Sequence, residues 1–288
     1  MKPAPFEYYA PGALDEALEL LERLGEGAKL LAGGQSLVPL LNMRLARPDA
    51  LIDLNRVAGL DEVRREGGEL RLGAMLRHRR LERDALVREH VPLLAEAASH
   101  IAHMQIRTRG TLGGSLANAA PAAELPAAVL ALEARLVVRS RSGTRELRPE
   151  GFFSGALQTA LAPDEILVEV RVPIPAPGTG WAFAEFARRR GDFALAGAAA
   201  LVRRDAARRI AAVRLALCGV AEVPLRLARL ERTLVGEAPG ERLLARVEAA
   251  VRAEVTPRAD LHLSAESRLE VAAEVARRAV SLALERCR

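Results

Sequence analysis

Two glycine-rich segments, far apart in the chain, place the strongest constraint on its fold. They read Ala32-Gly33-Gly34-Gln35-Ser36 and Thr111-Leu112-Gly113-Gly114-Ser115, and each holds a glycine pair followed closely by a serine. A diphosphate needs several backbone N–H groups within hydrogen-bond distance, and glycines leave that approach open because they have no Cβ. The first segment also leads into a helix expected from Leu37, whose N-terminal dipole favours an anion. If both segments serve one site, the fold would bring them together so that they hold a single diphosphate from two sides.

Neither segment identifies a site by itself, because a Gly-Gly pair before a serine is common in ordinary turns. The sequence has no Gly-x-Gly-x-x-Gly after its first expected strand and no Gly-Lys-Ser/Thr motif, which disfavours a Rossmann or P-loop nucleotide site. Ser36 and Ser115 can donate hydroxyl hydrogen bonds to a phosphate. Neither serine lies in a Gly-x-Ser-x-Gly elbow, so a phosphate donor is a better interpretation than a nucleophile for both.

Residues 1–55 are expected to form a small α/β unit. Apolar residues recur at helical spacing over 13–24 and stop at Gly25, and a second helix is expected over 37–45. Short buried strands are expected over 29–32 and 50–54.

Residues 56–176 are expected to form a second unit that begins with a β-hairpin. Two alternating runs over 62–73 flank Gly67-Gly68, which is a hairpin signal. A glycine-rich loop is expected over 108–119. Helices are expected at 79–88, 92–103 and 122–131, the last with Pro126 in its first turn, and strands at 135–140, 144–148 and 166–172. The proline-rich stretch 173–178 is the clearest linker.

Residues 177–288 are expected to form an α+β unit, because strand patterns come first and helix patterns follow. Three antiparallel strands are expected at 181–188, 195–204 and 209–218. Helices are expected at 225–235, 240–255 and 265–287, and the last of these carries an apolar face.

Composition excludes several classes of protein. Half of the residues are hydrophobic and 27% are charged, which excludes a disordered or collagen-like chain. No apolar run is long enough to cross a bilayer and the N-terminus has no signal-peptide core, so the expected location is the cytoplasm. The pI near 9.9 does not predict nucleic-acid binding, because the arginines are interleaved with acids. The two cysteines, Cys218 and Cys287, are expected to be buried and unpaired.

Two long stretches give the sequence a specific resemblance. Residues 29–53, KLLAGGQSLVPLLNMRLARPDALID, and 105–132, QIRTRGTLGGSLANAAPAAELPAAVLAL, resemble the medium, flavin-binding subunit of the molybdenum hydroxylases. That family includes the aerobic carbon monoxide dehydrogenases and the xanthine dehydrogenases. The likeness extends into the third unit at 188–195, RRRGDFAL.

The resemblance implies a two-part FAD-binding region of the vanillyl-alcohol-oxidase (PCMH) type, followed by an α+β C-terminal domain. The residues implied to contact FAD are Ala32, Gly33, Gly34, Gln35, Ser36, Leu37, Ile101, Ala102, Thr111, Leu112, Gly113, Gly114, Ser115, Asn118, Glu124, Leu167, Asp192 and Phe193. The two glycine-rich segments would hold the diphosphate, whereas Asn118 and Glu124 would hold the ribitol, ribose or adenine part. Glu124 is also explained as an acid at a helix N-terminus. Ile101, Ala102 and Leu167 are also explained as packing residues.

The chain departs from its relatives at two of these positions. Phe193, in a loop implied to lie by the isoalloxazine ring and to influence acceptor access, stands where a tyrosine is frequent, and Gln35 stands where some relatives have histidine. His100 and His103 have a spacing compatible with metal binding, but no third ligand is evident and no metal site is expected.

The implied function is electron transfer by an oxidoreductase subunit. Electrons from a molybdopterin centre on a large partner would pass through 2Fe–2S clusters on a small partner to the FAD, and an external acceptor would reoxidise it, within a dimer of heterotrimers. No catalytic side chain is expected here, because the cofactor supplies the chemistry. Two alternatives remain: a self-contained flavin oxidoreductase, with Asp192 as its only obvious base, and a scaffold protein that has lost its flavin.

Overall fold

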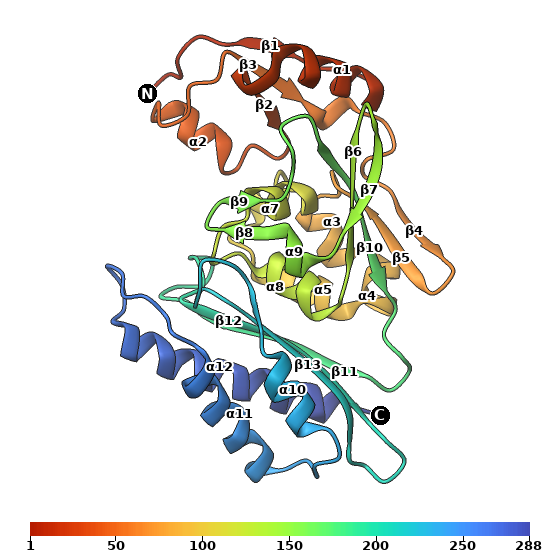
Figure 1. The fold of residues 1–288 in the computed structure, drawn as a ribbon, viewed down its shortest axis with the longest axis vertical. Helices are drawn as coiled ribbons and strands as arrows, with labels where there is room; N and C mark the ends of the chain where they lie inside the picture. The colour runs from red at the N-terminus through yellow and green to blue at the C-terminus, as the bar shows by residue number, and fades with distance from the viewer.

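The computed structural model describes all of residues 1–288, and the chain runs through three units stacked along its long axis (Figure 1). Three hydrophobic cores of 11, 36 and 27 buried residues follow this order. The largest core, in the middle, also includes residues from one face of the C-terminal sheet, such as Phe183 and Cys218. The second and third units are therefore joined by shared apolar packing.

The N-terminal unit is a three-stranded parallel sheet in the order β1-β3-β2. Its elements are β1 (Glu7–Tyr9), α1 (Leu14–Leu24), β2 (Ala28–Leu31), α2 (Leu37–Asn42) and β3 (Ala50–Asp53), with short 3₁₀ turns at Gly25–Gly27 and Leu54–Arg56. Strand β1 was not predicted, because its three residues pair only with a strand more than forty positions away. Helix α2 ends at Asn42 and not at the predicted Leu45, since Arg44 adopts a left-handed conformation with φ of 59°.

The second unit contains a five-stranded antiparallel sheet in the order β4-β5-β10-β6-β7. The strands are β4 (Val63–Glu66), β5 (Glu69–Gly73), β6 (Arg135–Ser140), β7 (Gly143–Leu147) and β10 (Ile166–Pro173). The predicted hairpin at Gly67-Gly68 is confirmed as the β4–β5 turn. A small hairpin of β8 (Phe153–Gly155) and β9 (Gln158–Thr159) was not predicted.

The helices of the second unit correct three predictions. They are α3 (His78–Arg83), α4 (Ala85–His90), α5 (Pro92–His100), α6 (Met104–Arg107), α7 (Leu112–Asn118), α8 (Glu124–Ala131) and α9 (Pro149–Phe152). The helix predicted over 79–88 is two helices, because Asp84 leaves the helical conformation and caps α4 through Leu86 N at 3.0 Å. The helix predicted over 92–103 ends at His100. The loop predicted over 108–119 is largely helical, whereas Pro126 does lie in the first turn of α8.

The C-terminal unit is a four-stranded antiparallel sheet in the order β11-β12-β13-β14. It is formed by β11 (Gly180–Phe186), β12 (Ala196–Arg204), β13 (Ile210–Cys218) and β14 (Leu225–Arg226), followed by α10 (Ala228–Leu234), α11 (Glu241–Glu254) and α12 (Ala265–Arg286). Helix α12 covers one face of this sheet, and α5 and α8 pack on the other (Figure 1). The three long strands confirm the prediction. The short β14 occupies the start of the helix predicted over 225–235, so the sheet has four strands and not three.

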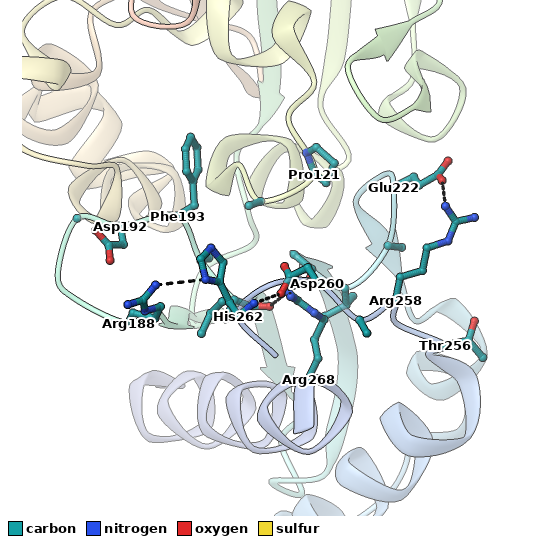
Figure 2. A pocket seen from close by; sticks show the side chains of 18 residues that line it. Pro121, Arg188, Asp192, Phe193, Glu222, Thr256, Arg258, Asp260, His262 and Arg268 are labelled. Carbon is teal, nitrogen blue, oxygen red and sulfur yellow. Dashed lines mark hydrogen bonds and ion pairs between the residues drawn. The ribbon is translucent and has the colours of Figure 1, made fainter. Parts of the chain in front are cut away.

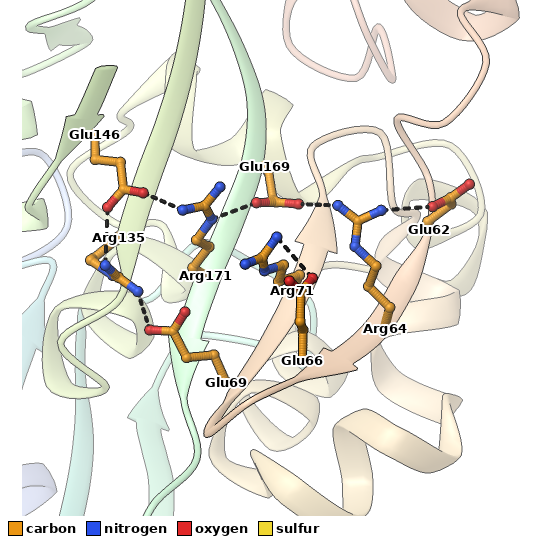
Figure 3. Close-up of polar contacts among 9 residues, drawn as sticks. All are labelled: Glu62, Arg64, Glu66, Glu69, Arg71, Arg135, Glu146, Glu169 and Arg171. Atoms are coloured by element: carbon orange, nitrogen blue, oxygen red, sulfur yellow. Dashed lines mark hydrogen bonds and ion pairs between the residues drawn. The ribbon is translucent and has the colours of Figure 1, made fainter. Parts of the chain in front are cut away.

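The arginines of the second sheet are neutralised by neighbouring glutamates. Figure 3 shows this network, in which Arg171 and Glu169 pair at 2.6 Å and Glu169 also pairs with Arg64 at 2.9 Å. Glu62, Glu69, Arg135 and Glu146 complete the network, and Arg71 and Glu66 form a separate pair beside it. This exposed face therefore presents alternating charges, and it lacks the uncompensated positive stripe that binds a phosphate backbone.

Both cysteines are buried and free, as predicted. Burial raises the pKa of the Cys218 thiol well above its usual value. No helix in the structure has the length and apolar content needed to cross a membrane.

Candidate functional site

The first glycine-rich segment forms an open cradle of backbone donors between β2 and α2. The N–H groups of Gly33, Gly34, Gln35 and Ser36 donate to no acceptor within the protein. Gly34 has a φ of +73°, a conformation that favours glycine, and Gln35 Nε2 donates to Gly33 O at 3.0 Å. Successive unpaired N–H groups before a helix are a natural site for an anion.

The second glycine-rich segment is the first turn of α7, and its amides are already used. Thr111 caps this helix, because its Oγ1 accepts a hydrogen bond from Gly114 N at 3.1 Å. The N–H groups of Leu112, Gly113 and Ser115 donate to Leu76 O, Ala74 O and Thr111 O. A Cβ on Gly113 would lie 2.5 Å from Ala74 Cβ, so this glycine permits close packing. The backbone amides of this segment are therefore not free to bind an anion.

The structure brings the two segments into direct contact. A Cβ added to Gly33 would lie 2.4 Å from Arg109 O and 2.7 Å from Gly110 Cα, so the backbones meet with no room for a side chain. On the other side, a Cβ on Gly114 would lie 3.3 Å from Ala32 Cβ. The proximity expected from the sequence is thus observed.

Three polar residues that the sequence analysis did not single out hold this junction. Asn55 Nδ2 donates to Ala32 O at 2.9 Å, and the Arg77 guanidinium donates to both Asn55 Oδ1 and Arg109 O. His78 Nε2–H donates a hydrogen bond to Thr111 O at 2.8 Å. No sequence motif marks these residues, because each acts on a segment distant in the chain.

His78 is a neutral structural residue. Its Nδ1 is buried without a partner, and a Cβ on Gly110 would lie 2.7 Å from that atom. Burial lowers the pKa of His78 to about 4, because the charged ring would lose its hydration. The imidazole therefore supports the backbone at Thr111 without adding a positive charge beside the cradle.

The backbone at Ile101 and Ala102, after the end of α5, is fixed by Arg107. The guanidinium Nη1 donates to Ile101 O at 2.8 Å and to Ala102 O at 3.0 Å. Ala102 has a left-handed φ of 40°, which is strained for a residue with a Cβ. Leu167, by contrast, is a core residue of β10 that pairs with Val138, which agrees with its packing interpretation.

Asn118 and Glu124 flank the connection between α7 and α8. Asn118 is the last residue of α7 and is half-buried, whereas Glu124 is the first residue of α8 and only 6% exposed. Burial, with a smaller contribution from the nearby Glu185 carboxylate, raises the pKa of Glu124 to about 8. A buried carboxyl at this position is suited to hydrogen bonding with a sugar hydroxyl.

Asp192 and Phe193 lie at the mouth of a cleft of about 950 Å³ (Figure 2). The cleft lies between Pro121-Ala122 and the C-terminal unit, whose loops contribute Arg188, Glu222, Arg258, Asp260 and His262 and whose helix α12 contributes Arg268. The Phe193 side chain is 75% exposed. Most of the charged groups in the cleft are paired, as Arg188 is with His262 and Arg258 with Glu222.

The two histidines of the candidate metal site serve other roles. His100 Nδ1 pairs with Glu185 Oε1 at 3.2 Å, and the His103 ring packs against Gly191. The structure contains no group of three or more potential metal ligands.

Comparison with known proteins gives matches over both halves of the chain. Residues 4–175 match the FAD binding domain in molybdopterin dehydrogenase, and residues 181–283 match the CO dehydrogenase flavoprotein C-terminal domain. The chain belongs to the FAD-binding medium subunits of the molybdenum hydroxylases. It is thus an oxidoreductase flavoprotein subunit, and its cofactor is FAD.

Relatives in this family align over nearly the whole chain. Caffeine dehydrogenase subunit beta of Pseudomonas sp. is 45% identical over 287 residues, which are 99% of this chain and 97% of that protein. The carbon monoxide dehydrogenase medium chain of Hydrogenophaga pseudoflava is 41% identical over 288 residues and all of both chains. A solved structure of the carbon monoxide dehydrogenase from that organism superposes with a TM-score of 0.97 at 40% identity, covering all of both chains. Quinoline 2-oxidoreductase from Pseudomonas putida 86 gives a TM-score of 0.95 at 38% identity over 99% of each chain.

The residues of the cradle fit the diphosphate of FAD. Four successive unpaired N–H groups at Gly33–Ser36 precede α2 and lie beside Gly114, so an anion would find several donors in one place. The site has no Lys or Arg side chain within either glycine-rich segment. The donors are therefore backbone dipoles, as in other nests that bind anions.

Proposed function

We propose that this chain is the electron-transferring FAD subunit of a cytoplasmic molybdenum hydroxylase complex. It would take electrons from 2Fe–2S clusters on a small partner subunit, which receive them from a large molybdopterin subunit, and deliver them to an external acceptor. The assembly would be a dimer of heterotrimers. The relatives named above as subunits or medium chains support a multi-subunit setting. FAD contributes the ability to exchange one or two electrons.

The run of unpaired amides at Gly33–Ser36 carries this proposal. We assign the diphosphate to that cradle and to Ser115, with Leu37 beginning the helix behind it. Asn118 and Glu124 would bind the sugar part, and Ile101 and Ala102 would present backbone groups along the cofactor. The proposed division of the chain is 1–55 and 56–176 for the FAD region and 177–288 for the C-terminal domain.

The proposal is tested by expressing the chain alone and together with its partner subunits. The purified chain is expected to bind FAD and show the flavin absorption bands, but not to be reduced by the organic substrate of the complex. The complex is expected to reduce its flavin when that substrate is added. Reduction of the chain by a small substrate without partners would instead establish a self-contained oxidoreductase.

A further inference from the structure

Arg268 is a buried cation that ties together three loops of the C-terminal unit. It is the fourth residue of α12 and is 6% exposed. Its Nη1 donates to Leu195 O at 2.7 Å and to Gly219 O at 3.0 Å, and its Nη2 pairs with Asp260 (Figure 2). One guanidinium thus contacts the segment after Phe193, the turn after β13 and the loop before α12.

Helix stability and packing alone do not explain an arginine here. A positive charge near the N-terminus of a helix opposes the helix dipole, and a buried charge loses its hydration. The Arg268 Nε is also buried without a hydrogen-bond partner. An apolar residue at this position would have no hydrogen-bond donors. The planar guanidinium has several donors in a fixed geometry, and they reach two carbonyls and a carboxylate at the same time.

Each of the three contacts leads to the cleft beside Phe193. Leu195 N donates to Phe186 O at 2.8 Å, which closes the loop that carries Asp192 and Phe193. Gly219 N donates to Pro121 O at 2.8 Å, which joins the turn to the connection between α7 and α8. Asp260 Oδ1 accepts from His262 N at 2.7 Å, and His262 lines the same cleft. The guanidinium therefore fixes the cleft walls relative to each other.

We propose that Arg268 is a positioning residue for reoxidation of the flavin. It holds the Phe193 loop and the Gly219 turn in place at the cleft, and it acts through their backbone carbonyls without touching the electron acceptor. The proposal rests on the proposed function, and it adds that the acceptor approaches the cofactor through the cleft that Phe193 lines.

The test compares Arg268→Met, which keeps the length of the side chain but loses its donors, with Arg268→Lys and a control. Arg252→Met is the control, because Arg252 also pairs with a residue of α12, Glu270 at 2.8 Å, but lies outside the cleft. The complex is assayed by stopped flow for flavin reduction by the partner subunits and, separately, for flavin reoxidation by the acceptor. Amide hydrogen exchange over residues 188–195 is measured on the full chain.

In Arg268→Met, kcat/KM for the acceptor is expected to fall roughly tenfold to a hundredfold, as small displacements of positioning groups do. FAD content and the rate of flavin reduction should stay unchanged, and exchange over 188–195 should rise. Arg268→Lys keeps the charge and a single donor group, so its kcat/KM for the acceptor should lie between those of Arg268→Met and the native chain. The control should have the same kcat/KM as the native chain. Equal loss of both half-reactions, loss of FAD, or unchanged exchange at 188–195 would overturn the proposal. A native chain that binds no FAD would instead refute the proposed function.

Discussion

Substitution of Gly33 by alanine tests the geometry of the cradle most directly. The added methyl group would lie 2.4 Å from Arg109 O and 2.7 Å from Gly110 Cα. Both are backbone atoms, which cannot rotate away as the end of a side chain can. Since ordinary contacts begin at 3.4 Å, the two segments must separate by about 1 Å.

The magnitude follows from the contact alone. Gly33 does not have a left-handed φ, so alanine adds no backbone strain. Relieving an overpacked contact of this kind costs about 1–3 kcal/mol. The free chain relaxes by separating the segments, and FAD binding has to close them again, so the affinity for FAD falls roughly fivefold to more than a hundredfold, because each 1.4 kcal/mol is a factor of ten in Kd.

The assay is titration of the FAD-free chain with FAD, followed by calorimetry and by quenching of flavin fluorescence. Gly68→Ala is the matched control, because Gly68 lies in the β4–β5 turn and a Cβ there meets no atom within 4 Å. Its Kd should equal that of the native chain. An unchanged Kd in Gly33→Ala would refute the assignment of the diphosphate to this cradle.

Three further predictions concern stability, measured by urea denaturation of the FAD-free chain. The pKa of Glu124 is raised from 4.5 to about 8, so between these pH values the folded chain keeps a proton that the unfolded chain releases. The unfolding free energy should therefore fall as the pH rises from 4.5 to 8, and Glu124→Gln should remove that pH dependence. The pKa of His78 is lowered from 6.5 to about 4, so between these pH values the unfolded chain binds a proton that the folded chain does not. The unfolding free energy should therefore fall as the pH falls from 6.5 to 4, and it should fall less in His78→Asn. Arg286→Met removes a two-bond pair with Glu96, at 2.8 and 3.0 Å, that joins α12 to α5, and should lower the unfolding free energy by about 1–2 kcal/mol. Arg258→Met should change it little, because the Arg258 side chain is exposed and pairs only with Glu222.

Local patterns predicted most of the secondary structure. The Gly67-Gly68 turn, the strands of the C-terminal sheet and the long final helix all follow from spacing of apolar residues and from turn chemistry, which neighbouring residues decide. The errors fall where distant partners decide. Strand β1 exists only because it pairs with β3, and α7 forms over a glycine pair because Thr111 caps it and Ala74 accepts from Gly113.

The two glycine-rich segments show the same division within the site. By itself, the sequence determined which two segments contain a glycine pair and, through resemblance, that they belong to an FAD-binding subunit. Only the tertiary structure decided that they play unequal roles. The backbone N–H groups of Gly33–Ser36 make no hydrogen bond within the protein, whereas those of residues 112–115 all do. A sequence records which residues lack a Cβ, but the partner of each N–H depends on which distant backbone packs beside it.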